Sequence, residues 1–356
     1  MLVTIVSFIF VLGILIFVHE LGHFLVAKKV GIRVERFSLG FPPTIFSRKR
    51  GETEYCIGVI PLGGYVKMAG ENPDEEVTGS PDEFMSKSIL QRSLVIFAGP
   101  FMNYLLAIVL LIGVYMFTGQ PLFDHDHVIV GTVTDDSPAA KAGLAPNDVI
   151  VALNGQPVNN FDSLRVKINA IKDAPLDLTW VAGNDTTTKQ VTTMVETVPN
   201  EQGGVDSIGV IGFSQKIIGY KKFGFFTSIE KGFVATHVIV YETVLFVKKF
   251  VFGQVSPKMI GGPIFIARQS GREAEKGASS LFFFMALLSV NLAVLNVLPI
   301  PILDGGHLVF LAAEKIKGSP LSMKTRVVAQ QVGLIFLLFL IVFVTYNDIL
   351  RAFRGF

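Results

Sequence analysis

The first 23 residues, Met1 to His23, read MLVTIVSFIFVLGILIFVHELGH and end an unbroken apolar run with two histidines and a glutamate. An apolar run of this length is typical of a helix that spans a membrane. Residues four apart share one helix face, so His19 and His23 can offer imidazole nitrogens to one Zn²⁺ at about 2.1 Å. Glu20 then lies beside the first ligand, where it can act as general base on the attacking water. The stretch predicts a zinc hydrolase site in a membrane span.

The composition also indicates an integral membrane protein. The chain has 356 residues, of which 50% are hydrophobic and 17% charged, and its mean hydropathy is +0.53. A net charge of +2 and the lack of a basic patch with aromatic residues give no sign of nucleic-acid binding. The single cysteine, Cys56, excludes an internal disulfide and a cysteine-based zinc site. No basic residue precedes the apolar run, so we expect no cleaved signal peptide.

Apolar stretches set the predicted membrane topology. The first span is 1–24, and three further stretches are long enough to cross the membrane: 93–117, 280–303 and 329–346. A weaker candidate at 225–252 carries charges at amphipathic spacing. We therefore expect it to lie on the membrane surface, within an amphipathic region at 215–275. The predicted fold is a multi-pass α-helical membrane protein with four transmembrane helices.

Basic residues give the orientation of these spans. The segments 25–92 and 304–328 are rich in lysine and arginine, and positively charged loops stay in the cytoplasm. Both termini and the block between the second and third spans then lie on the opposite side. If 225–252 crossed the membrane, the end of the third span would emerge about 30 Å from His19. A metal ion bound both by the first span and by the end of the third span excludes that arrangement.

The block at 124–200 is the expected soluble domain. Its strand patterns, a short helix after Ser137-Pro138 and a turn at Asn154-Gly155 predict a small α+β module. The passage resembles a bacterial PDZ domain, which takes an extended peptide as an added strand. We therefore expect peptide binding or substrate gating here, with a structural spacer as the alternative. His125 and His127 are interpreted as solvated loop residues rather than metal ligands.

The second half of the active site is expected in the third span. Its end reads Asn296-Val297-Leu298-Pro299-Ile300-Pro301-Ile302-Leu303-Asp304-Gly305-Gly306-His307. The two prolines must end or unwind the helix and expose backbone groups. Asp304 can then complete a His, His, carboxylate ligand set. Alternatively, Asp304 caps the following helix and His307 is the third ligand. The spacing leaves both possibilities open.

Three segments together resemble the site-2 protease family of zinc intramembrane proteases. They are His19 to His23, Gly99-Pro100-Phe101-Met102-Asn103 and Asn296 to Gly306. More narrowly, the chain is similar to the bacterial regulator of sigma-E protease type, whose members carry a periplasmic PDZ insertion between the second and third spans. Some members carry two such domains, whereas this chain has room for one.

The resemblance implies a role for each matching residue. His19, His23 and Asp304 would bind Zn²⁺ and Glu20 would be the catalytic base, while His307 would be structural. Substrate contacts are implied at Asn296, Gly99, Asn103, Pro299 and Pro301. Gly99 and Asn103 would also let the second span pack closely beside the site. For Asn103 and Asn296, a hydrogen bond between helices is the alternative to substrate contact.

The resemblance also implies substrates and a location. The implied activity is a metalloendopeptidase that cleaves single-span membrane proteins, such as an anti-sigma factor or signal-peptide remnants, in regulated intramembrane proteolysis during an envelope stress response. The implied location is the bacterial inner membrane, with both termini and the PDZ-like domain in the periplasm and the active site toward the cytoplasm. The implied partners are these substrates, a peptide ligand of the PDZ-like domain and the lipid bilayer.

A helical substrate must be unwound before its carbonyl groups can be attacked. The segment 53–68, with strand-like residues around Gly58 and Gly63-Gly64, is interpreted as a β-hairpin that re-enters the membrane and binds the substrate as an added strand. An ordinary cytoplasmic loop is the alternative.

Two other classes of function are alternatives to the protease. A zinc transporter predicts internal repeats and ionisable residues along several helices, and the sequence shows neither. A catalytically inactive PDZ scaffold has no need of Glu20.

Overall fold

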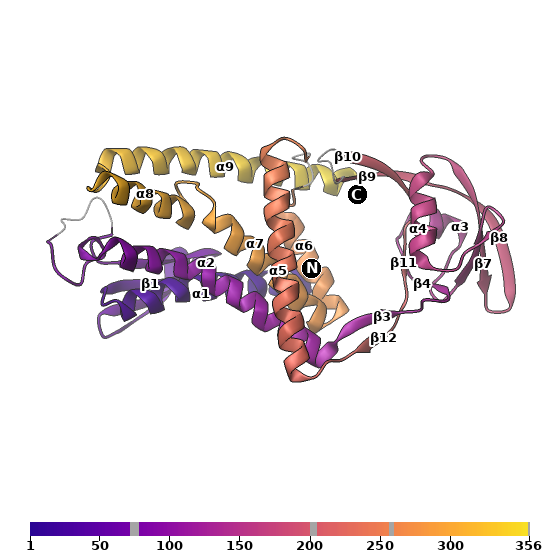
Figure 1. Ribbon diagram of the computed structural model, residues 1–356, viewed down its shortest axis with the longest axis horizontal. Coiled ribbons are helices and arrows are strands. Elements are labelled where there is room, and N and C mark those ends of the chain that lie inside the picture. Colours follow the sequence, from indigo (N-terminus) through magenta and orange to yellow (C-terminus); the bar gives the residue numbers. More distant parts are fainter. Residues whose placement is uncertain (72–77, 200–204, 256–259, 355–356) are drawn as a thin grey trace. The chain divides into compact units, whose positions relative to one another are not determined.

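In the part of the chain that the computed structural model describes, four helices are long and apolar enough to span a membrane (Figure 1). The structure describes residues 1–71, 78–199, 205–255 and 260–354. The four helices are α1 (Leu2–Lys29), α2 (Ile89–Gly113), α7 (Ala278–Val297) and α9 (Met323–Arg354). The prediction of four transmembrane helices is confirmed.

The third span ends earlier than predicted. Its helix, α7, stops at Val297, whereas the predicted span continues to residue 303. Leu298 has extended backbone, as expected for a residue before proline, and neither Pro299 nor Pro301 can donate a backbone hydrogen bond. After an irregular stretch over 298–303, the chain enters the short helix α8 (Asp304–Lys317).

Helix α1 buries one narrow stripe. Ser7, Val11 and Leu15 recur every four residues and are among its most buried side chains. Val11 and Leu15 pack with Met285 of α7, while much of the remaining surface of α1 is apolar and exposed. This pattern suits a helix with one face in protein and the others in lipid.

Between α1 and α2 the chain forms two long strands, β1 (Val34–Arg50) and β2 (Thr53–Met68). Both bend where Gly40 and Gly58 approach each other, so residues 36–39 pair with 54–57 on one side and with 64–67 on the other. The hairpin predicted within 53–68 is therefore wrong in its pairing. Its two ends run in opposite directions but do not pair with each other, because residues 36–39 of β1 lie between them and pair with both.

The chain divides into two compact units. The first consists of Met1–Val114, Phe225–Val247 and Pro257–Phe356, and the second of Tyr115–Gly224 and Lys248–Ser256. The second unit contains a sheet in which the strands follow the order β11 (Phe213–Gln215), β4 (Val128–Val133), β5 (Val149–Leu153), β7 (Pro175–Ala182), β8 (Asp185–Thr192). Strand β6 (Gln156–Pro157) pairs with β5. Two further strand pairs are β3 (Gln120–Phe123) with β12 (Ile217–Lys221), and β9 (Met194–Pro199) with β10 (Val205–Val210).

Two helices complete this unit, α3 (Pro138–Ala142) and α4 (Phe161–Ala170). Leu164 of α4 packs with Ile150, Leu178 and Trp180 of the sheet in one buried core. The predicted α+β architecture is confirmed. The sheet continues beyond the predicted end at residue 200, because β11 pairs with β4.

The predicted helix at 225–252 corresponds to α5 (Phe225–Val251), and it is not among the four span candidates. Gly232 of α5 lies against Ile112 of α2, and Thr243 donates a 2.8 Å hydrogen bond to Asn291 of α7. A second amphipathic helix, α6 (Pro263–Lys276), packs against α1, where Gly271 contacts Thr4. The location of α5 on the membrane surface stays a prediction.

Candidate metal centre

The structure brings together the three residues predicted as metal ligands. His19, His23 and Asp304 each offer one ligand atom, and these atoms all lie within 4.8 Å of one another. His19 Nε2 lies 3.2 Å from both His23 Nε2 and Asp304 Oδ2, and His23 Nε2 lies 3.7 Å from Asp304 Oδ1. Among the residues that the structure describes, no other group of three or more His, Cys, Asp or Glu residues is this close.

The chemistry of this group fits a zinc ion. Asp304 Oδ2 is buried and makes no hydrogen bond within the described part of the chain, although His19 Nε2 is only 3.2 Å away. Two imidazole nitrogens this close to a buried carboxylate oxygen that has no hydrogen bond form a donor set that zinc accepts. Three protein ligands also leave a fourth position open for chemistry, as in catalytic zinc sites.

Helix α2 fixes the ring of His23. The Nδ1 atom of His23 lies 2.8 Å from the carbonyl oxygen of Val95, and the contact is buried. Because a carbonyl only accepts, Nδ1 must carry the hydrogen, which leaves the lone pair of Nε2 directed at the group. No pattern in the sequence indicates this backbone contact.

Two glycines allow α1 and α2 to approach closely. A Cβ atom at Gly99 would collide with the rings of both His19 and His23, and one at Gly22 would collide with the backbone oxygen of Ala98. The predicted close packing of Gly99 beside the site is what the structure shows. A substrate contact at Gly99 stays a prediction.

Asn103 of α2 contacts the ring of His19. Its Nδ2 atom is 3.3 Å from His19 Nδ1, its side chain is fully buried, and its Oδ1 has no hydrogen-bond partner within the described residues. When Nε2 of a histidine binds metal, Nδ1 carries a hydrogen. A half-turn of the amide then lets Oδ1 accept that hydrogen. Ser289 of α7 holds the backbone of Asn103 through a 2.7 Å hydrogen bond to its carbonyl oxygen.

Asp304 is placed by the start of α8. It is the first residue of that helix, and Gly305 and Gly306 pack directly on the backbone of 297–298 and 300–301. A Cβ atom at either glycine would collide with this backbone, which explains two glycines after the aspartate. The alternative ligand, His307, does not belong to the group of converging atoms. Burial lowers the pKa of His307, against the opposing effect of Asp304.

Three other predicted site residues lie at or just beyond the end of α7. Asn296 lies in the last turn of α7 and is half-buried, Pro299 is exposed and Pro301 is half-buried. Within the described residues, no hydrogen bond joins Asn296 to the three ligands. Their contact with substrate stays a prediction.

The sheet reaches the candidate catalytic base. A Cβ atom at Gly64 of β2 would lie 2.9 Å from Cγ of Glu20 and 3.0 Å from Cγ2 of Ile16. The glycine therefore lets the backbone of β2 pass directly beside Glu20. Sequence reasoning selected Gly63-Gly64 for strand formation and missed this contact.

Zinc-type ligands next to a glutamate on an apolar spanning helix define the class of membrane-embedded zinc hydrolases. The chain belongs to peptidase family M50, whose sequence model matches residues 7–340. It is a zinc metalloprotease of this family, and the predicted family, enzyme class and zinc cofactor are confirmed.

Relatives match over almost the whole chain. A putative zinc metalloprotease of Clostridium perfringens is 37% identical over 337 residues, which cover 94% of this chain and 95% of the relative. The regulator of sigma-W protease RasP of Bacillus subtilis is 30% identical, with 98% and 99% covered. The zinc metalloprotease RasP of Geobacillus kaustophilus is 31% identical, with 98% of each chain covered.

A solved structure also matches part of the chain. The PDZ domain of an SdrC-like protein from Listeria monocytogenes is 19% identical, covers 26% of this chain and 92% of its own, and has a TM-score of 0.22.

Proposed function

We propose that this protein is an intramembrane endopeptidase that cleaves single-span membrane proteins. His19, His23 and Asp304 hold zinc, and Glu20 is the catalytic base. The observation that carries the proposal is the proximity of Asp304 to two histidines on an apolar spanning helix, with the backbone of a strand directly beside Glu20.

Each residue has a distinct task in peptide hydrolysis. When bound, zinc supplies Lewis-acid polarisation of the scissile carbonyl group and acidifies the attacking water. Glu20 takes a proton from that water and passes it to the leaving amine as the peptide C–N bond breaks. Val95 fixes the orientation of His23, and Asn103 that of His19. The ligands are thus oriented before substrate binds.

The strand beside Glu20 offers a binding edge for substrate. Residues 64–67 pair with β1 on one side only, and no strand in the described part of the chain pairs with their other side. An unpaired edge accepts an extended peptide through backbone hydrogen bonds. Substrate bound there as an added strand has its carbonyl groups freed from helical hydrogen bonds next to Glu20. This edge is the proposed site at which a spanning helix is held unwound.

The orientation and the substrates follow from charge and relatives. The proposed location is a bacterial inner membrane, with the metal centre toward the cytoplasmic side and both termini and the α+β domain in the periplasm; the basic segments 25–92 and 304–328 support this orientation. Proposed substrates are single-span proteins already shortened outside, such as an anti-sigma factor or signal-peptide remnants. The name of the Bacillus subtilis relative, a regulator of sigma-W protease, supports the first of these. The α+β domain would bind a peptide or restrict substrate access.

The test is cleavage of a single-span reporter by purified full-length protein in detergent. Glu20→Gln keeps the size of the side chain but removes the base, so we expect cleavage to fall at least about 100-fold while zinc content stays unchanged. Glu275→Gln is the matched control, because Glu275 is an exposed glutamate on α6. Unchanged cleavage by Glu20→Gln would defeat the proposal.

A further inference from the structure

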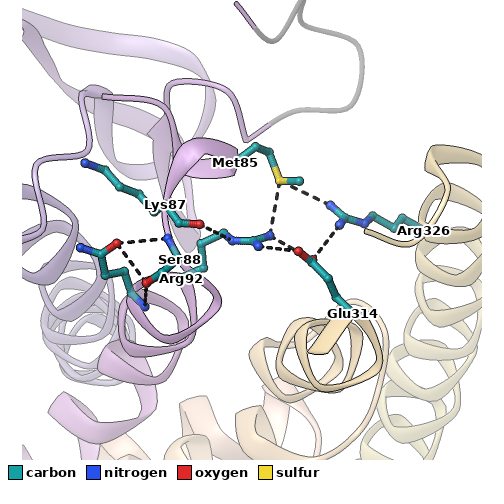
Figure 2. Close-up of polar contacts among 7 residues, drawn as sticks. Met85, Lys87, Ser88, Arg92, Glu314 and Arg326 are labelled. Atoms are coloured by element: carbon teal, nitrogen blue, oxygen red, sulfur yellow. Dashed lines mark hydrogen bonds and ion pairs between the residues drawn. The ribbon is translucent and has the colours of Figure 1, made fainter. Parts of the chain in front are cut away.

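A buried cluster of charges joins three helices at one end of the spanning bundle (Figure 2). Glu314 of α8 and Arg92 in the first turn of α2 are only 6% and 4% exposed. Their contact is bidentate: Arg92 Nη1 donates to Glu314 Oε2 at 3.1 Å, and Nη2 donates to Oε1 at 2.6 Å. Arg326 of α9 approaches the same carboxylate at 3.5 Å without a hydrogen bond.

The guanidinium of Arg92 is itself held in place. Its Nε donates to the backbone oxygen of Lys87 at 3.1 Å. The first turn of α2 around it is fixed by a capping box, in which Ser88 and Gln91 exchange hydrogen bonds. A guanidinium held in this way specifies the position and the orientation of the partner carboxylate. Buried pairs of this kind add little to stability over apolar packing, and their best-attested use is to specify one register.

One face of α2 connects this pair to the metal centre. Four residues recur along it at spacings of three or four, which places them on one side of the helix. Arg92 binds Glu314 of α8, and the backbone of Val95 contacts Nδ1 of His23. Gly99 lies against both imidazole rings, and Asn103 contacts Nδ1 of His19. The same face that orients both histidines therefore also binds α8.

The position of Asp304 depends on how α8 docks. No regular structure links α8 to α7, since residues 298–303 are irregular, and Asp304 Oδ2 has no hydrogen bond of its own within the described residues. Leu311 of α8 shares a buried cluster with Val95 of α2, and Glu314 lies three residues further along. Asp304 and Glu314 are ten residues apart, or about 15 Å along the helix. A slip or rotation of α8 on α2 would move Asp304 away from the histidines.

We propose that the Arg92–Glu314 pair is a positioning device of the metal centre. It sets the register of α8 on α2 and thereby presents Asp304 to His19 and His23. This inference rests on the proposed function, because it takes Asp304 as a zinc ligand. Neither Arg92 nor Glu314 touches the group of ligand atoms, so both are positioning residues rather than catalytic ones.

The experiment measures the zinc affinity of purified full-length variants in detergent by competition with a chelator. Glu314→Gln and Arg92→Lys each break the bidentate fork, and we expect affinity to fall about 10- to 100-fold, as for other groups that orient metal ligands. Arg326→Lys is the matched control: it changes a cation near the same carboxylate but removes no hydrogen bond to it, so we expect a smaller loss than for Arg92→Lys. Wild-type affinity in both fork variants would overturn the proposal.

A double variant separates register from charge balance. Arg92→Met with Glu314→Leu removes both charges of the fork together, so neither partner of the fork is left as a buried unpaired charge, and Arg326 loses only an ion pair without a hydrogen bond. We expect its zinc affinity to stay below that of the wild type, because the fork is absent. Full recovery of affinity in this variant would overturn the proposal, since only charge pairing would then matter.

A second cycle tests whether the effect acts through Asp304. In an Asp304→Ala background, Glu314→Gln should cause no further loss of zinc affinity, because the ligand that it positions is already gone. Losses that multiply would overturn the positioning role and leave the proposed function intact. Unchanged affinity in Asp304→Ala alone would contradict the ligand assignment, and with it both proposals.

Discussion

The two halves of the metal centre are built in different ways. His19 and His23 lie on the continuous helix α1, so their separation follows from helix geometry alone. Asp304 follows an irregular stretch that begins at Leu298, and its place depends on how α8 packs on α2. The first half is a local property of the chain, whereas the second exists only in the folded molecule.

This difference gives α2 an importance that its sequence hides. The helix supplies no ligand, yet Val95 orients His23, Asn103 contacts His19 and Arg92 binds the helix that begins with Asp304. Changes at these positions of α2 should therefore disturb how a ligand is held, whereas a change to a ligand removes that half of the centre.

Loss of the local half should have the largest effect. His23→Ala removes a ligand that no neighbouring residue can replace, so we expect zinc affinity to fall by more than about 100-fold and reporter cleavage to be lost. Zinc per protein, measured by mass spectrometry, checks this. His237→Ala is the control, because His237 contacts Phe233 and Tyr104 instead of the ligands. Full zinc occupancy in His23→Ala would show that the metal lies elsewhere.

Loss of the tertiary half should come next. Asp304→Ala is expected to lower zinc affinity by about 10- to 100-fold, because two histidines still bind the ion weakly. His307→Ala should keep nearly the affinity of the wild type, since His307 lies outside the converging group. The reverse order, measured by chelator competition, would make His307 the third ligand and support the alternative that the spacing leaves open.

The local half of the fold and site could be predicted from sequence because its signals are local. Apolar length predicts four spans, and the spacing of His19 and His23 predicts the ligand pair. The end of the third span at Val297 rather than 303 was within reach too, since Pro299 and Pro301 disfavour helix before them. The predicted and observed structures therefore agree for features that are determined within a single helix.

The tertiary half could not be predicted because it depends on pairing between distant segments. The arms of 53–68 look able to pair with each other, and only the insertion of residues 36–39 between them excludes it. Arg92 and Glu314 are 222 residues apart. In the sequence, both are charged residues beside apolar stretches. This pattern indicates that each has a partner but does not identify that partner.

Packing between α1 and α2 should have a smaller effect than loss of a ligand. Gly99→Ala places a methyl group against both imidazole rings, so we expect about 1–3 kcal/mol of strain and a clear loss of zinc affinity. Gly113→Ala, on the same helix, meets nothing within 4 Å and should leave zinc affinity and cleavage unchanged. Equal zinc affinity in the two variants would mean that the helices separate at no cost, contrary to the structure.

The smallest effect is expected at Asn103, where the family resemblance implies a substrate contact and the structure shows a contact with His19. If Asn103 orients His19, Asn103→Leu should weaken zinc binding about tenfold and lower kcat, and Asn103→Asp should restore binding because a carboxylate oxygen can accept from Nδ1–H. If Asn103 binds substrate, as the sequence suggests, Asn103→Leu should raise KM at unchanged zinc affinity. Chelator competition and reporter kinetics on the same preparations distinguish the two. The buried side chain and its 3.3 Å contact with His19 Nδ1 favour the first result.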